Sequence, residues 1–170
     1  MKEDYHIDMS GRIYKKKTVG IACVGAQTKT NNGCALKGNL IKFIQKNLCI
    51  GSVYEEYAKL YAISIFLLVK GKVKDISTLI ICNDEDFNYV KEYLLFLIQQ
   101  EGDSLLEIIS IGDLKKKLGR NVKSLADNFA KCYRKRALNK NKWENGKKLD
   151  VINIDYKTIE EYWKKLEKIK

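Results

Sequence analysis

Thr78-Leu79-Ile80-Ile81-Cys82 is a continuous, almost entirely apolar run in a chain of 170 residues, and acidic residues follow it closely. A strand that is covered on both faces has such a run, whereas a half-exposed strand alternates. The segments on either side, Val53–Lys70 and Phe87–Gln100, repeat apolar side chains at spacings of three and four and predict helices. This order indicates an α/β fold with Thr78–Cys82 as its central strand.

The residues before this unit predict an antiparallel meander. Tyr5–Met9 alternates apolar and polar side chains, and the pair Ser10-Gly11 predicts a turn after it. Thr18–Ala26 predicts a second strand. Beyond the turn-rich stretch Thr28–Gly33, Asn39–Gln45 fits either a third strand or a short helix, and we favour the strand.

The C-terminal part predicts further alternation. Leu105–Ile111 is strand-like, Lys123–Arg136 is helical, Val151–Asp155 fits a last strand, and Thr158–Ile169 is an amphipathic helix. We therefore expect a mixed sheet with an N-terminal antiparallel meander, followed by alternating helices and strands, with helices on both faces. The length fits a single domain, 1–170, with a core at about 4–137, a basic segment at 131–148 and a strand and helix extension at 149–170.

The cysteines and the single histidine exclude several kinds of site. Five cysteines without a C-x-x-C pair give little support to a disulfide framework or a zinc site, and His6 alone cannot form a His-rich metal site. Reduced, buried thiols in a cytoplasmic protein are the expectation. The longest nearly apolar run, Leu60–Val69, is too short to span a bilayer, so we expect no membrane partner and no signal peptide.

The positive charge is concentrated in one part of the sequence. The chain carries a formal net charge of +11, and the window Lys115–Lys148 alone contains 13 basic and two acidic residues, so it accounts for the whole excess. Tyr133 and Trp143 lie within it as possible stacking surfaces. This pattern predicts a nucleic-acid partner. The candidate contacts are Lys115, Lys116, Lys117, Arg120, Lys123, Lys131, Arg134, Lys135, Arg136, Lys140, Lys142 and Trp143.

Acidic residues occupy four notable positions in the expected order: three lie where a strand ends or a helix begins, and Asp127 lies in the middle of the expected helix Lys123–Arg136. Each also has a structural explanation. Asp8 fits a turn, and Glu55 or Glu56 fits the N-terminal end of a helix dipole. Asp84 or Asp86 fits an N-cap, and Asp127 fits an ion pair with Lys123 or Lys131. Taken together, carboxylates at one sheet edge would repel one another unless cations joined them. An all-oxygen set suits Mg²⁺ or Mn²⁺. The candidates are Asp8, Glu55 or Glu56, Asp84 or Asp86, and Asp127.

Several of these segments resemble motifs of the ribonuclease H-like superfamily. Tyr5–Gly11, with its D-x-S-G sequence, resembles the family's first strand and turn, and Leu79–Asp84 resembles its central strand ending in Asp. Counted from Glu55, alanines at +3 and +7 and an aliphatic residue at +8 are similar to the helix that begins with the family's catalytic Glu. Ala126–Ala130 is similar to the A-D-x-L-A of its last catalytic helix.

The resemblance implies a two-metal mechanism. Asp8 would bridge two Mg²⁺ ions, and Glu55, Asp84 and Asp127 would complete the ligand set, with Glu56 and Asp86 as less favoured choices. The implied activity is a metal-dependent, ribonuclease H-like nuclease acting on RNA or an RNA–DNA hybrid.

Other functions fit the same sequence. A structure-specific DNA nuclease of the junction-resolvase type would use the same acids. A non-catalytic nucleic-acid-binding module would keep the fold and the basic segment without cleavage. An interaction protein would use the helix Thr158–Ile169. Mg²⁺-dependent cleavage that Asp8→Asn abolishes separates the enzymes from the other two.

Overall fold

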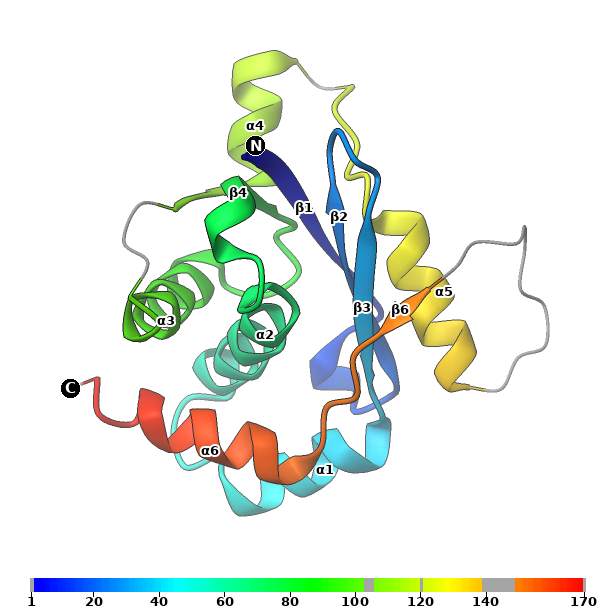
Figure 1. Cartoon of the computed structure of the whole chain (residues 1–170). Coiled ribbons are helices and arrows are strands. Elements are labelled where there is room, and N and C mark those ends of the chain that lie inside the picture. The colour runs from blue at the N-terminus through cyan, green and yellow to red at the C-terminus, as the bar shows by residue number, and fades with distance from the viewer. Residues whose placement is uncertain (1, 103–105, 120, 139–148, 170) are drawn as a thin grey trace.

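The computed structural model describes residues 2–102, 106–119, 121–138 and 149–169, which form a six-stranded sheet and six α-helices (Figure 1). The strands are β1 (Glu3–Ser10), β2 (Val19–Gly25), β3 (Asn31–Leu36), β4 (Ile76–Ile81), β5 (Glu107–Ser110) and β6 (Asp150–Val151). The helices are α1 (Gly38–Asn47), α2 (Val53–Val69), α3 (Phe87–Gln100), α4 (Ile111–Leu118), α5 (Asp127–Ala137) and α6 (Tyr156–Leu166).

The sheet is mixed, with strand order β5-β4-β1-β2-β3-β6. Strands β1, β2 and β3 pair antiparallel in sequence, whereas β4 and β5 run parallel to β1. The predicted α/β fold, with its N-terminal antiparallel strands, is confirmed. Because β1 and β4 are parallel neighbours, with Ile7 opposite Ile81, their carboxyl ends lie at the same edge of the sheet.

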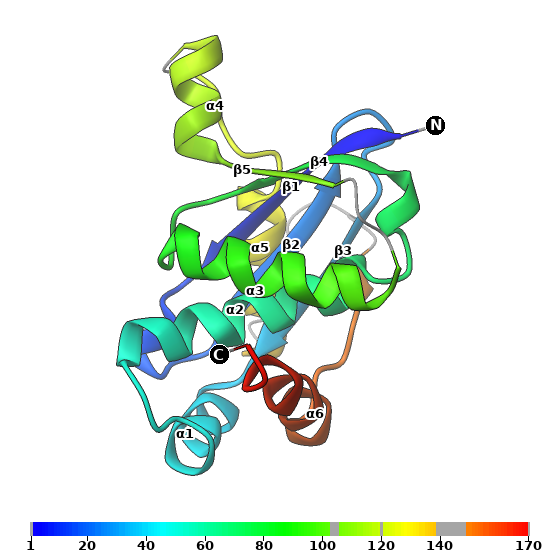
Figure 2. The same cartoon turned by 90° about the vertical axis from the view of Figure 1, so that its left-hand side faces the viewer.

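Helices cover both faces of this sheet (Figures 1 and 2). The larger core lies under α2, α3 and α6, and it receives the strand residues Ile7 and Ile21. The opposite face is covered by α5, where Ala130 and Tyr133 pack on Ala22. Since side chains alternate along a strand, Asp8 belongs to the α5 face.

The third strand lies earlier in the chain than we expected. Asn39–Gln45 belongs to helix α1, with Ile41 and Ile44 buried at a helical spacing, so the strand prediction there is wrong. Strand β3 instead occupies Asn31–Leu36, which overlaps the stretch that its Asn and Gly residues mark as a turn. Gly33 serves packing, because a Cβ at this position would lie 2.3 Å from Cε2 of Tyr133.

Helix α4 has no counterpart in the prediction, which assigns its first residue, Ile111, to the strand Leu105–Ile111, and the start of α5 also differs from the prediction. Helix α4 follows β5 directly, with the Ser110 hydroxyl accepting a hydrogen bond from Asp113 N at 3.0 Å. Helix α5 begins at Asp127 and not at Lys123, so Asp127 is the first residue of the helix. The expected position of Asp127 in the middle of a helix is therefore wrong. Helices α2 and α3 have nearly the predicted bounds, because both carry long apolar faces.

Candidate functional site

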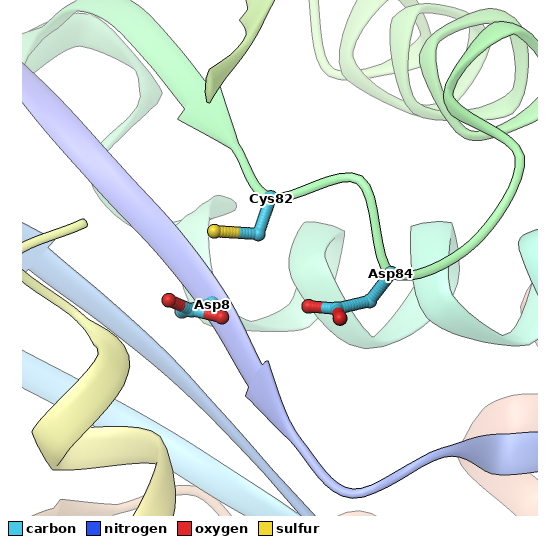
Figure 3. A group of neighbouring side chains, drawn as sticks. All are labelled: Asp8, Cys82 and Asp84. Atoms are coloured by element: carbon cyan, nitrogen blue, oxygen red, sulfur yellow. The ribbon is translucent and has the colours of Figure 1, made fainter. Parts of the chain in front are cut away.

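Asp8 and Asp84 approach each other at the edge where β1 and β4 end. Asp8 lies near the end of β1, and Asp84 follows the last residue of β4, Ile81, by three positions. One ligand atom from each of Asp8, Cys82 and Asp84 can be chosen so that all three lie within 4.8 Å of one another. Figure 3 shows the side chains of Cys82 and Asp84 directed from the end of β4 towards Asp8. The predicted approach of these two acids is thus present.

Burial makes this pair of carboxylates electrostatically costly. The side chain of Asp8 is only 7% exposed, and its Oδ1 accepts a hydrogen bond of 2.8 Å from Met9 N. Burial, and then the charge of Asp8, raise the pKa of Asp84 to about 6. Burial and Asp8 also raise the pKa of the Cys82 thiol. At neutral pH the pair offers oxygen ligands to a hard cation, whereas the thiol remains protonated.

Arg12 supplies a positive charge that contacts Asp84. Its Nη1 donates to Oδ1 of Asp84 at 2.8 Å and to the Asp84 carbonyl oxygen at 3.0 Å. The Arg12 side chain is 44% exposed and that of Asp84 is 18% exposed, so solvent screens the ion pair in part. Arg12 lowers the pKa of Asp84, but burial and Asp8 outweigh it.

Two residues that no sequence motif singles out, Glu85 and Tyr61, interact electrostatically with these acids. Burial and the charge of Asp84 raise the pKa of Glu85 to about 7. Tyr61 of α2 is fully buried, and burial together with the charges of Asp84, Cys82, Asp8 and Glu85 raises its pKa. Among the described residues, neither Oε1 of Glu85 nor the Tyr61 hydroxyl has a hydrogen-bond partner. Buried polar atoms are normally paired, so these two oxygens are exceptions among the described residues.

The glutamates of α2 are engaged elsewhere. Glu55 accepts a hydrogen bond from the Tyr93 hydroxyl of α3, and Glu56 forms a buried ion pair of 3.5 Å with Lys59. Neither joins the described group of Asp8, Cys82 and Asp84. The expectation that a glutamate at the start of α2 meets the two aspartates is therefore not met.

Asp86 has a structural role instead of a place in the acidic site. It is the N-cap of α3, and its Oδ1 accepts hydrogen bonds from Asn88 N at 3.0 Å and Tyr89 N at 3.4 Å. Of the two alternatives after β4, Asp84 is the one that approaches Asp8.

Asp127 does not join the described group of Asp8, Cys82 and Asp84. Its half-exposed carboxylate forms an ion pair of 2.6 Å with Lys131, one turn further along α5. The charge of Asp8 also acts on Lys131 and raises its pKa, after the larger effect of Asp127. Lys131 therefore links the acid on the helix with the acid on the strand.

The predicted nucleic-acid contacts are distributed over three elements. Lys115, Lys116 and Lys117 lie on α4, which stands away from the sheet in Figure 2, Lys123 precedes α5, and Lys131, Arg134, Lys135 and Arg136 lie on α5. Arg120, Lys140, Lys142 and Trp143 lie outside the described residues. Tyr133 is not a stacking surface, because it is 2% exposed and donates to Asn31 Oδ1 and the Asp150 carbonyl oxygen.

No protein-family model matches the chain, and neither a curated protein nor a solved structure matches it. Among the described residues, no helix has both the length and the apolar character needed to cross a membrane.

Proposed function

We propose that this chain is a divalent-metal-dependent nuclease of the ribonuclease H-like type. The observation that carries the proposal is the approach of Asp8 and Asp84 within one group of ligand atoms at the carboxyl ends of two parallel strands. Such strand ends form the ligand crevice of open α/β sheets. The mixed sheet, with β1 central and parallel to β4 and β5, agrees with what the sequence resemblance implies.

The residues present fit a hard cation at this position. Asp8 and Asp84 would supply carboxylate oxygens. Glu85 lies close enough to Asp84 for the charge of Asp84 to raise the pKa of Glu85. A bound Mg²⁺ or Mn²⁺ would polarise the phosphodiester and lower the pKa of a water. The described group provides for one ion between Asp8 and Asp84. A second ion would need a further acid, and Asp127, paired with Lys131, and Glu85, which interacts with Asp84, are the candidates we propose.

Cations beside the acids would hold the phosphate. Lys131 is close enough to Asp8 for their charges to interact, and Arg12 contacts Asp84 directly. Guanidinium groups bind phosphate through paired donors, and ammonium groups bind it as point charges. We propose RNA or an RNA–DNA hybrid as the substrate, because a backbone-directed site can read helix geometry without reading bases.

Cleavage assays on the full chain test this proposal. Labelled RNA–DNA hybrid, single-stranded RNA and branched DNA are incubated with Mg²⁺, with Mn²⁺ and with EDTA. We expect metal-dependent cleavage of the hybrid or of the RNA, and its loss in both Asp8→Asn and Asp84→Asn. Asp86→Asn is the matched control, because Asn also caps helices and should leave cleavage intact.

The same assay distinguishes the other functions. Cleavage of branched DNA alone would identify a structure-specific DNA nuclease. Binding of nucleic acid without cleavage under any metal would identify a non-catalytic binding module. Full cleavage by Asp8→Asn would reject the site.

A further inference from the structure

A strongly basic cavity lies apart from the acids of the candidate site. It has a volume of about 590 Å³ and is formed where the β1–β2 connection, the start of α1 and the end of α5 meet. Its described lining residues include no acid. The cations that line it are Lys16, Lys17, Lys37, Lys42 and Arg134. Only Arg134 belongs to the basic segment that the sequence analysis connected with nucleic acid.

Among the described residues, no acid forms an ion pair with the lysines of this cavity. Within the described part of the chain, Lys16, Lys17, Lys37 and Lys42 take part in no ion pair. Helix α1 begins here without an acidic residue in its first turn, and the side chain of its N-cap residue, Lys37, accepts no hydrogen bond from the helix. The partial positive charge of its N-terminus therefore adds to that of the lysines. Four unpaired cations around one cavity produce a local field that attracts a polyanion.

Thr18 fixes the geometry of this cavity. Its carbonyl oxygen accepts a hydrogen bond of 2.9 Å from Nε of Arg134, and its Oγ1 accepts one of 3.4 Å from Gly38 N. The start of α1 and the end of α5 are thus both joined to the residue that precedes β2. The cations belong to separate segments of the chain, but the fold holds these segments together.

Arg134 connects the cavity with the acidic site. A Cβ built on Gly11 would lie 3.5 Å from Cζ of Arg134, so the guanidinium covers the turn that follows β1. Gly11 is three residues beyond Asp8, which corresponds to about 10 Å of extended chain. Lys131, one turn before Arg134 on α5, interacts with Asp8. Positive charge therefore continues from the carboxylates to the cavity.

We infer that this cavity binds the phosphodiester backbone of a nucleic-acid strand, a few nucleotides from the bond held at Asp8 and Asp84. The lysines are spread around an open cavity, which suits successive phosphates of a strand better than one small anion. The choice of nucleic acid as partner rests on the proposed nuclease function.

Binding in EDTA tests the inference independently of catalysis. A short fluorescein-labelled RNA is titrated with the full chain, and anisotropy is followed from about 50 to about 200 mM salt. The pocket variant carries Lys16→Ala, Lys17→Ala and Lys42→Ala. The matched control carries Lys74→Ala, Lys91→Ala and Lys168→Ala, which remove the same charge from other surfaces. Thermal unfolding checks that both variants are folded.

We expect the pocket variant to bind about tenfold or more weakly at low salt, and its salt slope to fall by about 2, since each phosphate contact on a single strand contributes about 0.7. In the control variant, the RNA affinity and the salt slope should both change far less. Equal losses in the two variants would overturn the inference, because net charge alone would then explain binding.

A parallel cleavage assay with Mg²⁺ separates the two proposals. A chain that never cleaves RNA or hybrid, but whose pocket variant loses binding, would reject the nuclease and keep the cavity. A chain that cleaves, and whose pocket variant behaves like the control, would reject the cavity and keep the nuclease.

Discussion

The guanidinium of Arg12 donates a hydrogen bond of 2.8 Å to the carboxylate of Asp84, which lies 72 positions further along the chain. This contact joins the turn after β1 to the loop after β4, the two segments that carry the candidate site. It also places a positive charge next to the carboxylate of Asp84, on which the negative charge of Asp8 already acts. A divalent cation bound to Asp84 would therefore lie close to a like charge.

Replacing Arg12 by Gln should separate metal binding from nucleic-acid binding. Without the guanidinium, we expect Mn²⁺ to bind several-fold more tightly, because a repulsive charge is gone. The metal-free protein should lose up to about 1 kcal/mol of stability, as for a partly exposed ion pair. RNA binding in EDTA should weaken, because a donor for phosphate is removed. Calorimetric Mn²⁺ titration and anisotropy measure the two affinities.

Lys15→Gln is the control for this change, since Lys15 is exposed and in the same connection. If Arg12→Gln weakened Mn²⁺ binding, Arg12 would be supporting the metal site by holding Asp84 in place, and the repulsion argument would fail.

The sequence is sufficient to predict the strands and helices that have long apolar faces. The buried run at β4 and the repeated apolar positions of α2 and α3 leave few alternatives to the structure. Strand β3 was missed because Asn31, Asn32 and Gly33 favour turns locally, and only tertiary contacts reverse this preference. Asn32, for example, is buried and donates to the Leu68 carbonyl oxygen at 2.7 Å.

The sequence predicts only the part of the candidate site that strand ends supply. Strand ends have a fixed place in an α/β sheet, so the approach of Asp8 to Asp84 follows from topology. The residue that a helix presents depends instead on its rotation about its own axis. Tyr61, whose pKa the charges of these acids help to raise, follows Glu55 by six positions and therefore lies about 120° around α2 from it. A single sequence does not determine the rotation of α2 at the polar end of that helix.

Metal ions should stabilise the folded chain through Asp8. We expect Mn²⁺ or Mg²⁺ to raise the unfolding temperature in proportion to the logarithm of its concentration, with about 1.4 kcal/mol for each tenfold excess over the dissociation constant. Asp8→Asn should abolish this shift and should be more stable than the unchanged chain in EDTA at pH 8, because Asp84 loses its charged neighbour. Differential scanning fluorimetry measures both effects.

Asp86→Asn provides the comparison, and it should keep the full metal-dependent shift. A shift that persisted in Asp8→Asn would place the metal elsewhere on the chain.

The raised pKa of Glu85 predicts that Glu85→Gln increases the stability of the fold by an amount that depends on pH. A carboxyl whose pKa rises to about 7 on folding stabilises the fold when protonated and loses this contribution as pH rises from about 4.5 through about 7. In EDTA, Glu85→Gln should be only slightly more stable than the unchanged chain at pH 5, where most of this contribution remains, and should exceed its stability by about 2 kcal/mol at pH 8, after allowance for screening. Urea unfolding at the two pH values gives the difference.

Comparing variant with parent removes other titrating groups from this result. His6 acts in the opposite sense, because burial lowers its pKa and stability then rises as pH increases towards its ordinary value. That contribution is common to both proteins. A Glu85→Gln chain with the same advantage at pH 5 and pH 8 would show that its gain is unrelated to ionisation.

Gly20→Ala should displace α5 from the sheet. A Cβ at Gly20 would lie 2.2 Å from the Ala130 carbonyl oxygen and 2.5 Å from Arg134 N, and both atoms belong to the backbone of α5. Backbone cannot move aside as a flexible side chain can, so we expect a loss of about 3 kcal/mol. Gly71→Ala is the matched control, because nothing lies within 4 Å of its added Cβ. It should be neutral or gain up to about 1 kcal/mol.

The same pair of variants tests whether α5 brings its cations to the acids. Lys131 and Arg134 are one turn apart on the helix that Gly20 contacts, so moving α5 should also weaken RNA binding under conditions where the variant remains folded. Urea unfolding measures the stabilities, and anisotropy in EDTA measures the binding. If Gly20→Ala equalled Gly71→Ala in stability and RNA affinity, α5 would not pack against β2 as described, and the link from Asp8 through Lys131 to Arg134 would be lost with it.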